Sequence, residues 1–208
     1  MSGRGKFISL EGGEGVGKST QVKALAAALR QRGIALVETR EPGGSDGAEK
    51  IRELLLTGDD GRWSARAEAL LFAAARADHA EKTIRPAIEA GTWVLCDRFV
   101  DSSLAYQGGA LDLGIAEVRA VNQFAIGELF PDRTLVLALA EGGARARARD
   151  NEDSDRIGGR PAGYHQRVDL AFRQIAAEEP GRVRIVDASG SPDEVTRRLL
   201  DQLEDLLP

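Results

Sequence analysis

Hydrophobic positions along the chain form short continuous runs, separated by longer stretches in which alanine, leucine and charged residues mix. The runs have the length and composition of strands that are buried on both faces of a parallel sheet. The predicted strands cover residues 7–10, 35–39, 93–96, 133–138 and 183–186. Helical stretches separate them, so the pattern predicts repeated strand–helix–strand units.

The helical stretches are predicted at residues 18–32, 47–56, 65–84, 104–110, 116–126, 162–179 and 193–206. Two of them have a clear start. Ser64 is the expected N-cap of the helix over residues 65–84, and Ser191, Pro192 and Glu194 form the pattern of a capping box. Pro86 is expected to interrupt or restart the long third helix. The pattern therefore predicts an α/β fold, with a central five-stranded, mostly parallel sheet, helices on both faces and the ligand at the carboxyl ends of the strands.

The residues between the first predicted strand and the first predicted helix fit the phosphate-loop pattern G-x-x-x-x-G-K-[ST] without a mismatch. They are Gly12, Gly13, Glu14, Gly15, Val16, Gly17, Lys18 and Ser19. Glycines allow a tight turn whose N–H groups point into one concavity, and the following helix adds a partial positive charge. The strand before it and the helix after it are the required setting, so the motif predicts a phosphate-loop NTPase fold.

This loop predicts an ATP site formed by residues 12–20, which end at Thr20. Lys18 would reach the β- and γ-phosphates, and the hydroxyl of Ser19 would bind Mg²⁺. The alternative is a glycine-rich turn before an ordinary helix, and the lysine and serine at the matching positions argue against it.

Two further predicted strands end in polar residues that suit a phosphate site. Asp97 follows a buried strand, where phosphate-loop enzymes carry an acid that helps to hold Mg²⁺. Arg40 follows the second strand and can place two donors on one phosphate. The alternatives are an aspartate that starts a turn and a solvated arginine in a plain loop.

Residues 142–159 form a charged segment that contains glycine and interrupts the strand–helix pattern. Its arginines are Arg145, Arg147, Arg149 and Arg156. Lids that close over phosphates often supply such cations during phosphoryl transfer. The alternative is a solvated helix, and for any single one of these arginines it has the stronger case.

Composition narrows the class of protein. A chain of 208 residues is expected to form one domain over residues 1–208. Its net charge of −5 argues against a general nucleic-acid binder and against a protein that binds anionic membranes. Cys96 is the only cysteine, which excludes an intrachain disulfide. The apolar run near the N-terminus is too short for a signal peptide, so a cytoplasmic location is expected.

Together, several stretches resemble bacterial thymidylate kinases. They are the phosphate loop within residues 7–20, the stretch 39–45, Asp97-Arg98-Phe99 with Ser102, and Ala105-Tyr106-Gln107-Gly108. The resemblance runs from Phe7 to the final helix, and this combination is far more specific than the phosphate loop alone. It implies transfer of a phosphoryl group from Mg²⁺-ATP to dTMP, giving dTDP on the way to dTTP. It also implies a homodimer.

The resemblance assigns several residues to the phosphate and sugar of the acceptor. Arg40 would bind the 5′-phosphate, and Arg98 would lie near the phosphates. Glu14 would contact the 3′-hydroxyl, while Tyr106 would pack against C2′ of the deoxyribose, where a ribose hydroxyl would clash. The bond before Pro42 is expected to be cis, as it often is in the family.

Other residues are assigned to the base. Phe72 would stack on thymine, and Arg76, four residues later on the same helix face, would donate to its exocyclic oxygen. Ser103 and Gln107 would lie around the base. By composition alone, Phe72 would be interpreted as an ordinary core residue.

The lid resembles the bacterial type in which arginines outside the phosphate loop stabilise the transferring phosphoryl group. Together with Lys18 and Arg98, Arg149 and Arg156 are the predicted catalytic residues, since they flank the glycine-bearing end of the segment. The chain departs from the family at Gly158 and Gly159, where an acidic residue is common.

Two other functions remain open from the sequence. One is a kinase for a different nucleoside monophosphate on the same fold. The other is an ATP-dependent switch that binds a partner, although the N-K-x-D motif of guanine-specific switches is absent from the sequence.

Overall fold

The computed structural model describes residues 3–139 and 156–208. Within these ranges five strands form a single sheet in the order β2-β3-β1-β4-β5, and all four pairings are parallel. This confirms the predicted five-stranded α/β fold. The strands are β1 (Phe7–Gly12), β2 (Leu36–Arg40), β3 (Trp93–Asp97), β4 (Arg133–Ala138) and β5 (Val183–Asp187).

Side chains of the central strands alternate between two hydrophobic cores, one on each face of the sheet. In β1, Phe7 lies in one core, while Ile8 and Leu10 lie in the other. In β3, Cys96 joins Phe7, and Leu95 joins Ile8. Both faces of these strands are therefore buried, which explains why the strands are continuous apolar runs in the sequence.

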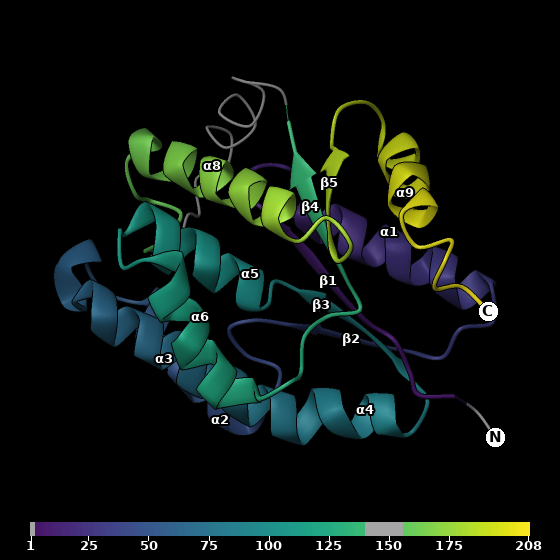
Figure 1. Ribbon diagram of the computed structural model, residues 1–208, viewed down its shortest axis with the longest axis horizontal. Helices are drawn as coiled ribbons and strands as arrows, with labels where there is room; N and C mark the ends of the chain where they lie inside the picture. Colours follow the sequence, from purple (N-terminus) through teal and green to yellow (C-terminus); the bar gives the residue numbers. More distant parts are fainter. Residues whose placement is uncertain (1–2, 140–155) are drawn as a thin grey trace.

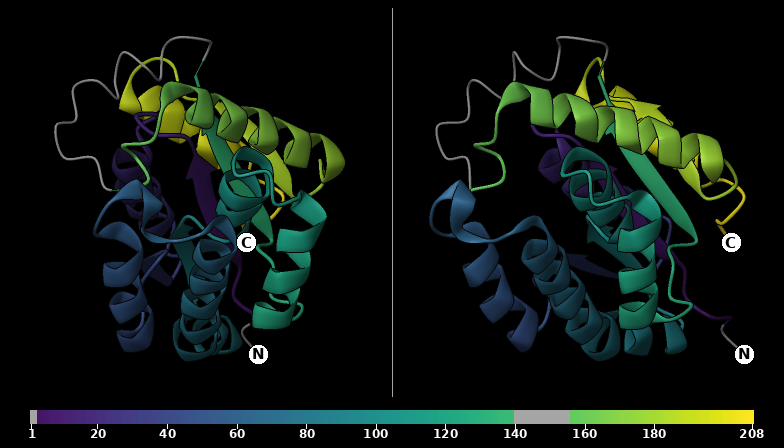
Figure 2. Two further views of the ribbon diagram at one scale, coloured as in Figure 1. Left: turned by 90° about the vertical axis from the view of Figure 1, so that its left-hand side faces the viewer. Right: turned by 60° about the vertical axis from the view of Figure 1, so that its left-hand side comes forward.

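Helices α1 (Lys18–Gln31) and α9 (Pro192–Asp201) pack together on one face of the sheet (Figure 1). The opposite core is built with the helices between β2 and β5, and Figure 2 shows α3 standing between α2 and α6. Those helices are α2 (Asp46–Leu56), α3 (Ala65–His79), α4 (Arg85–Glu89), α5 (Val100–Ser103), α6 (Ile115–Ile126) and α8 (Ala162–Glu178). None of the helices in the described ranges has the length and apolar character that a membrane span requires.

The predicted helix over residues 65–84 continues further than expected. It widens into a π-helical turn, η2 (Ala80–Ile84), and then continues as α4 as far as Glu89. Pro86 therefore stands inside a longer helical segment instead of ending it. A single helical turn with wider hydrogen-bond spacing accommodates the proline, which has no N–H to donate.

The helix ends follow the capping signals in the sequence. The hydroxyl of Ser64 accepts from the N–H of Ala67 at the start of α3, and Ser191 with Glu194 forms the complete capping box of α9. Helix α9 ends at Asp201, before the predicted end at residue 206. After Asp201 the backbone forms turns whose hydrogen bonds join residues three apart, such as the bond from the N–H of Leu203 to the carbonyl oxygen of Leu200.

The order of the strands fixes where a ligand can bind. The connection from β1 to β2 runs toward one edge of the sheet, and the connection from β3 to β4 runs toward the opposite edge. The crevice of a doubly wound sheet lies at such a switch point, outside the carboxyl ends of the strands. The phosphate loop follows β1, and Arg98 follows β3, so both meet at this crevice.

Candidate active site

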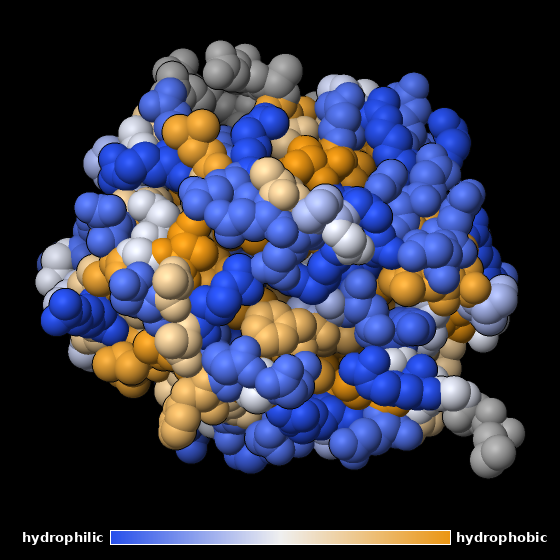
Figure 3. Space-filling view, in the orientation of Figure 1, coloured by the Kyte–Doolittle hydropathy of each residue, from blue (hydrophilic) through white to orange (hydrophobic). Residues whose placement is uncertain are grey.

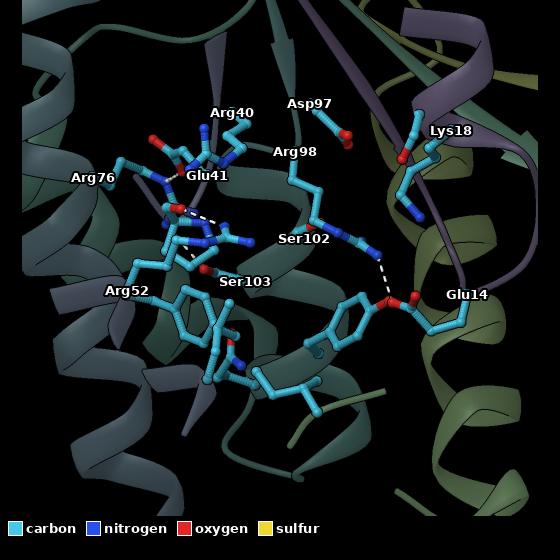
Figure 4. Close-up of a pocket in the computed structure, with 17 residues that line it drawn as sticks. Glu14, Lys18, Arg40, Glu41, Arg52, Arg76, Asp97, Arg98, Ser102 and Ser103 are labelled. Atoms are coloured by element: carbon cyan, nitrogen blue, oxygen red, sulfur yellow. Dashed lines mark hydrogen bonds and ion pairs between the residues drawn. The ribbon is translucent and has the colours of Figure 1, made fainter. Parts of the chain in front are cut away.

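A pocket with a volume of about 200 Å³ opens at the carboxyl ends of β1, β2 and β3. Figure 4 shows the phosphate loop at one end and a group of arginines at the other. The pocket brings together these predicted site residues: Glu14, Lys18, Ser19, Arg40, Phe72, Arg76, Asp97, Arg98, Ser103, Tyr106 and Gln107.

The phosphate loop has the backbone that its glycines predict. Gly12 has φ of +133°, and a Cβ there would lie 2.4 Å from the carbonyl oxygen of Leu137. Gly17 has φ of +90° and precedes α1 without a side-chain cap. The first N–H groups of α1 are therefore left for a ligand, as at other anion sites on helix N-termini.

Lys18 is buried below this loop, and its Nζ donates to the carbonyl oxygen of Gly13 over 2.7 Å. Burial, together with the positive charge of Arg98, lowers the pKa of Lys18 to about 8. A bound anion would favour the charged amine. Lys18 is thus held at the bottom of a site that favours negative charge.

Ser19 and Asp97 fit the magnesium site that phosphate-loop chemistry implies. Ser19 is exposed at the start of α1 and lines the pocket. Oδ1 of Asp97 is buried and has no hydrogen-bond partner in the part of the chain that the structure describes. Mg²⁺ prefers oxygen ligands, takes few from the protein and completes its shell with water and substrate phosphates. A hydroxyl beside an unpaired carboxylate oxygen is a donor set of this kind.

Arg98 lies in the centre of the pocket and connects its walls (Figure 4). Its φ is +69°, a conformation that side-chain-bearing residues rarely adopt. The guanidinium donates to the carbonyl of Gly12 over 3.0 Å, to Ser102 Oγ over 3.1 Å and to Glu14 Oε1 over 2.7 Å. It also lies 5.0 Å from the centre of the Tyr106 ring. These contacts hold a cation beside the phosphate loop.

The charges around Arg98 affect its neighbours in turn. Burial would raise the pKa of Glu14, but Arg98 and Lys18 lower it below its ordinary value. The hydroxyl of Tyr106 also donates to Glu14, over 3.2 Å. Glu14 is therefore an ionised acceptor, with a side chain 39% exposed toward solvent and the pocket.

Two more arginines lie at the far end of the pocket. Arg40 is exposed and pairs with Glu49 over 3.0 Å. Arg52, on α2, also lines the pocket and donates to the carbonyl of Pro42 over 2.7 Å. The sequence prediction missed Arg52, because it is a lone arginine within a helix and belongs to no motif. The predicted cis bond is present between Glu41 and Pro42.

Arg76 is fully buried and bonded through four of its five N–H groups. Nε donates to Glu41 over 2.7 Å, and one N–H of Nη2 donates to the carbonyl of Phe99 over 3.0 Å. Both hydrogens of Nη1 are used, by Ser103 Oγ at 2.9 Å and by Asn122 Oδ1. One N–H of Nη2 is left at the pocket wall, where a ligand carbonyl could accept from it.

The position of Phe72 is compatible both with stacking on a base and with a place in the core. Its ring lines the pocket and also packs, half-buried, against the core on that face of the sheet. An aromatic ring with one open face beside Arg76 can stack on a planar base.

Tyr106 and Gln107 belong to a second π-helical segment, η3 (Leu104–Ala110). Such wider turns are common at functional sites, because they change the direction of side chains. Both side chains are buried at the pocket wall, and Nε2 of Gln107 donates to Glu68 over 3.0 Å.

The structure puts Arg156 away from the phosphate loop. Its side chain is 1% exposed and pairs with Glu68 of α3 over 2.6 Å. Nε donates to the carbonyl of Leu55 over 2.8 Å. Contact with a transferring phosphoryl group would require these bonds to break, so in this arrangement Arg156 joins elements and does not line the pocket. Arg145, Arg147 and Arg149 lie outside the described residues.

Comparison with known proteins settles the family. A family model described as thymidylate kinase matches residues 10–199. The chain belongs to the thymidylate kinase family. Its phosphate loop and its base-end pocket both lie within the matched range.

Relatives within the family cover nearly the whole chain. A thymidylate kinase of Rhizorhabdus wittichii is 61% identical over 206 residues, which are 98% of this chain and 99% of the relative. A thymidylate kinase of Bradyrhizobium diazoefficiens is 47% identical over 211 residues, which are 100% of this chain and 92% of the relative. The crystal structure of thymidylate kinase from Ehrlichia chaffeensis has a TM-score of 0.80 at 28% identity, covering 97% of this chain and 100% of that one.

Proposed function

We propose that this protein transfers the γ-phosphoryl group of ATP to the 5′-phosphate of dTMP. The observation that carries the proposal is one pocket with a phosphate loop at one end and a base-sized apolar and polar wall at the other. Arg98 lies in the centre of this pocket, and Arg40 and Arg52 line it at the end away from the phosphate loop. Membership of the thymidylate kinase family supports the choice of acceptor.

The acceptor would lie across the pocket with its phosphate toward the phosphate loop. Arg40, Arg52 and Arg98 would bind this phosphate with paired N–H donors. Glu14 would accept from the 3′-hydroxyl, and the ring of Tyr106 would exclude a 2′-hydroxyl. Phe72, Arg76, Ser103 and Gln107 would hold the base.

Mg²⁺ would be held by Ser19 and Asp97. When bound, the metal neutralises charge on the transferring phosphates. The unpaired Oδ1 of Asp97 supports this assignment, since a buried carboxylate oxygen without a partner is costly unless a ligand satisfies it.

The chain's own residues would act by positioning and by neutralising charge. The attacking group is an anionic phosphate oxygen, so no strong general base is needed. The donor and acceptor phosphates both carry negative charge. Lys18 and Arg98 would offset this charge and hold the two phosphates in line for transfer. Of the two arginines of the segment 142–159 chosen first from the sequence, Arg149 would add positive charge near the transition state, whereas Arg156 is bonded to Glu68 and to the carbonyl of Leu55.

The homodimer expected from the family also remains a proposal. Two neighbouring helices each carry an exposed apolar side chain, Leu70 on α3 at 58% and Phe124 on α6 at 95%. Figure 3 shows apolar patches over these helices. Light scattering of the purified protein tests this: Phe124→Ser should shift a dimer toward monomer, and a wild-type monomer would contradict it. The cytoplasmic location and the single domain stay predictions.

A coupled assay of ADP release tests the function. We expect rapid ADP formation with Mg²⁺-ATP and dTMP, slower turnover with dUMP, and little with dCMP, dGMP or AMP. Faster turnover with another monophosphate would favour a different kinase. Slow ADP release that is indifferent to every acceptor would favour an ATP-dependent switch.

A further inference from the structure

Glu68 lies outside the residues assigned to the reaction, yet its carboxylate is the most fully bonded group near the base end. It is completely buried on α3. Oε1 accepts from Gln107 Nε2 at 3.0 Å and from Arg160 Nη1 at 3.2 Å. Oε2 accepts from Arg156 Nη2 at 2.6 Å and from Arg160 Nη2 at 2.7 Å. Four donors thus occupy the roughly four lone-pair positions of a carboxylate.

This carboxylate is ionised. Burial alone would raise its pKa, but the hydrogen bonds from Arg160, Gln107 and Arg156 lower the pKa of Glu68 below its ordinary value. An ionised carboxylate accepts hydrogen bonds and cannot donate them. Whatever faces Oε1 must therefore present an N–H or O–H group.

The consequence falls on Gln107. Its side-chain amide has a donor end and an acceptor end, and only the NH₂ end can face Glu68. Turning the amide over would bring a carbonyl against a carboxylate and leave two acceptors buried without a proton between them. Gln107 is 1% exposed and lines the pocket. The carbonyl end is therefore the end that remains for a ligand.

Within the described residues, this wall then offers an acceptor on Gln107 and a remaining donor on Arg76. The edge of thymine or uracil has a carbonyl beside an N–H, which matches this pair. Cytosine reverses the two, with an amino group beside an unprotonated nitrogen. A donor–acceptor pair fixed in one orientation can distinguish these edges, because a mismatched buried group is left unpaired.

We propose that Glu68 is a positioning residue that sets the choice of base by holding the Gln107 amide with its carbonyl toward the pocket. The inference rests on the proposed function and explains how one acceptor class is selected. Glu68 itself does not line the pocket. It acts through Gln107, while Arg156 and Arg160 hold the carboxylate in place.

A structural role for Glu68, as the counterion of two buried arginines, is the competing explanation, and Asp60 offers a matched control. Asp60 Oδ1 accepts from Arg160 Nε at 2.7 Å, and its side chain is 59% exposed. Glu68→Gln and Asp60→Asn each remove one negative charge from the same cluster. Only the first changes the group that faces Gln107.

The experiment measures kcat/KM for dTMP and for dCMP in the wild type and both variants. Glu68→Gln places an amide against Gln107, which can turn over and present its NH₂ end to the pocket. We expect the dTMP-to-dCMP ratio to fall about tenfold or more, the size of one lost hydrogen bond. Asp60→Asn should change the ratio by less than about twofold, as for other exposed positions. The KM for ATP should stay constant in both.

Two further variants keep the test decisive. If circular dichroism shows that Glu68→Gln does not fold, Glu68→Asp keeps the charge for the arginines but withdraws the carboxylate from Gln107, and the same fall is expected. In a Gln107→Leu background, the change at Glu68 should no longer alter the ratio. Equal ratios in folded Glu68 and Asp60 variants, or a persisting effect in that background, would overturn the inference. A wild type that does not phosphorylate dTMP would instead overturn the proposed function.

Discussion

At the phosphate-loop end of the pocket, Ser19 is exposed, the first turn of α1 has no side-chain cap, and Oδ1 of Asp97 has no partner among the described residues. At the base end, Arg76 and Gln107 are both 1% exposed. Four of the five N–H groups of Arg76 bond to the protein, and the NH₂ end of Gln107 is held by Glu68.

The difference separates binding strength from selectivity. The unbonded groups at the phosphate end can bind any nucleoside triphosphate with its metal, because charges and backbone N–H groups do not distinguish one base from another. At the base end, Arg76 and Gln107 are held by the protein and present a donor and an acceptor in fixed positions, so a base edge that matches both is favoured. Changes at the first end should alter turnover, whereas changes at the second should alter the choice of acceptor.

The largest effect is expected from Lys18→Ala. Loss of the buried amine removes the cation beneath the phosphate loop, and kcat should fall by about 10³-fold or more. The fold should persist, because within the described residues the amine of Lys18 has a single hydrogen bond, to the carbonyl of Gly13. ADP-release kinetics and thermal melting check this; near-normal turnover in the folded variant would contradict the assignment.

The next comparison concerns the two arginines predicted to be catalytic. Arg149→Ala should lower kcat about 10²-fold with little change in the Kd of either substrate, as for a group that acts only in the transition state. Arg156→Ala should mainly destabilise the fold, by roughly 2–4 kcal/mol, because it leaves a buried carboxylate with fewer partners. Kinetics and melting of both variants decide between the roles. A large loss of kcat in a stable, folded Arg156→Ala variant would show instead that Arg156 is catalytic.

At the base end, Phe72→Ala should weaken dTMP binding by about 1–3 kcal/mol, the usual size of a lost base–aromatic stack. ATP affinity should barely change, because Phe72 belongs to α3 and not to the phosphate loop. Calorimetric titration with each nucleotide measures both. Parallel loss of ATP binding and of the folded state would instead show that the ring is mainly a core residue.

The smallest effect concerns pH. Lys18 in the free protein has a pKa of about 8, lower than that of a solvated lysine, and bound phosphates would raise it again. Binding therefore takes up a proton above pH 8, and ATP affinity should fall as pH rises, by about tenfold between pH 7 and pH 9. Lys18→Arg keeps its charge throughout this range and should lose the slope. Equal slopes in the two proteins would exclude Lys18 as the titrating group.

Much of the pocket could be predicted from the sequence because its parts lie in short motifs. The phosphate loop and Asp97 each follow a recognisable strand, and parallel strands bring their carboxyl ends to one edge. Resemblance added Phe72, which composition alone would have left in the core, and it also assigned Arg76 and Gln107 to the base. Arg52 was missed, since nothing in its helix marks it as different from other surface arginines.

Arg156 illustrates the opposite limit. Its place next to a charged segment favoured a catalytic role, but its partners, Glu68 and the carbonyl of Leu55, lie 88 and 101 residues away along the chain, respectively. No local pattern reports a pairing over such separations. Burial of both partners appears only once α2 and α3 are packed against the chain that follows residue 155.

The sequence by itself determined the strands, most helix starts, the phosphate loop and the family resemblance, because hydrophobic period, capping and glycine placement act over a few residues. The tertiary structure decided which polar groups are available to a ligand and which are already bonded to the protein. Within the described residues, Oδ1 of Asp97 has no partner, four N–H groups of Arg76 are bonded to the protein, and the NH₂ end of Gln107 is held by Glu68. These outcomes depend on residues that packing brings together, since the donors and acceptors around a buried polar group determine its hydrogen bonds.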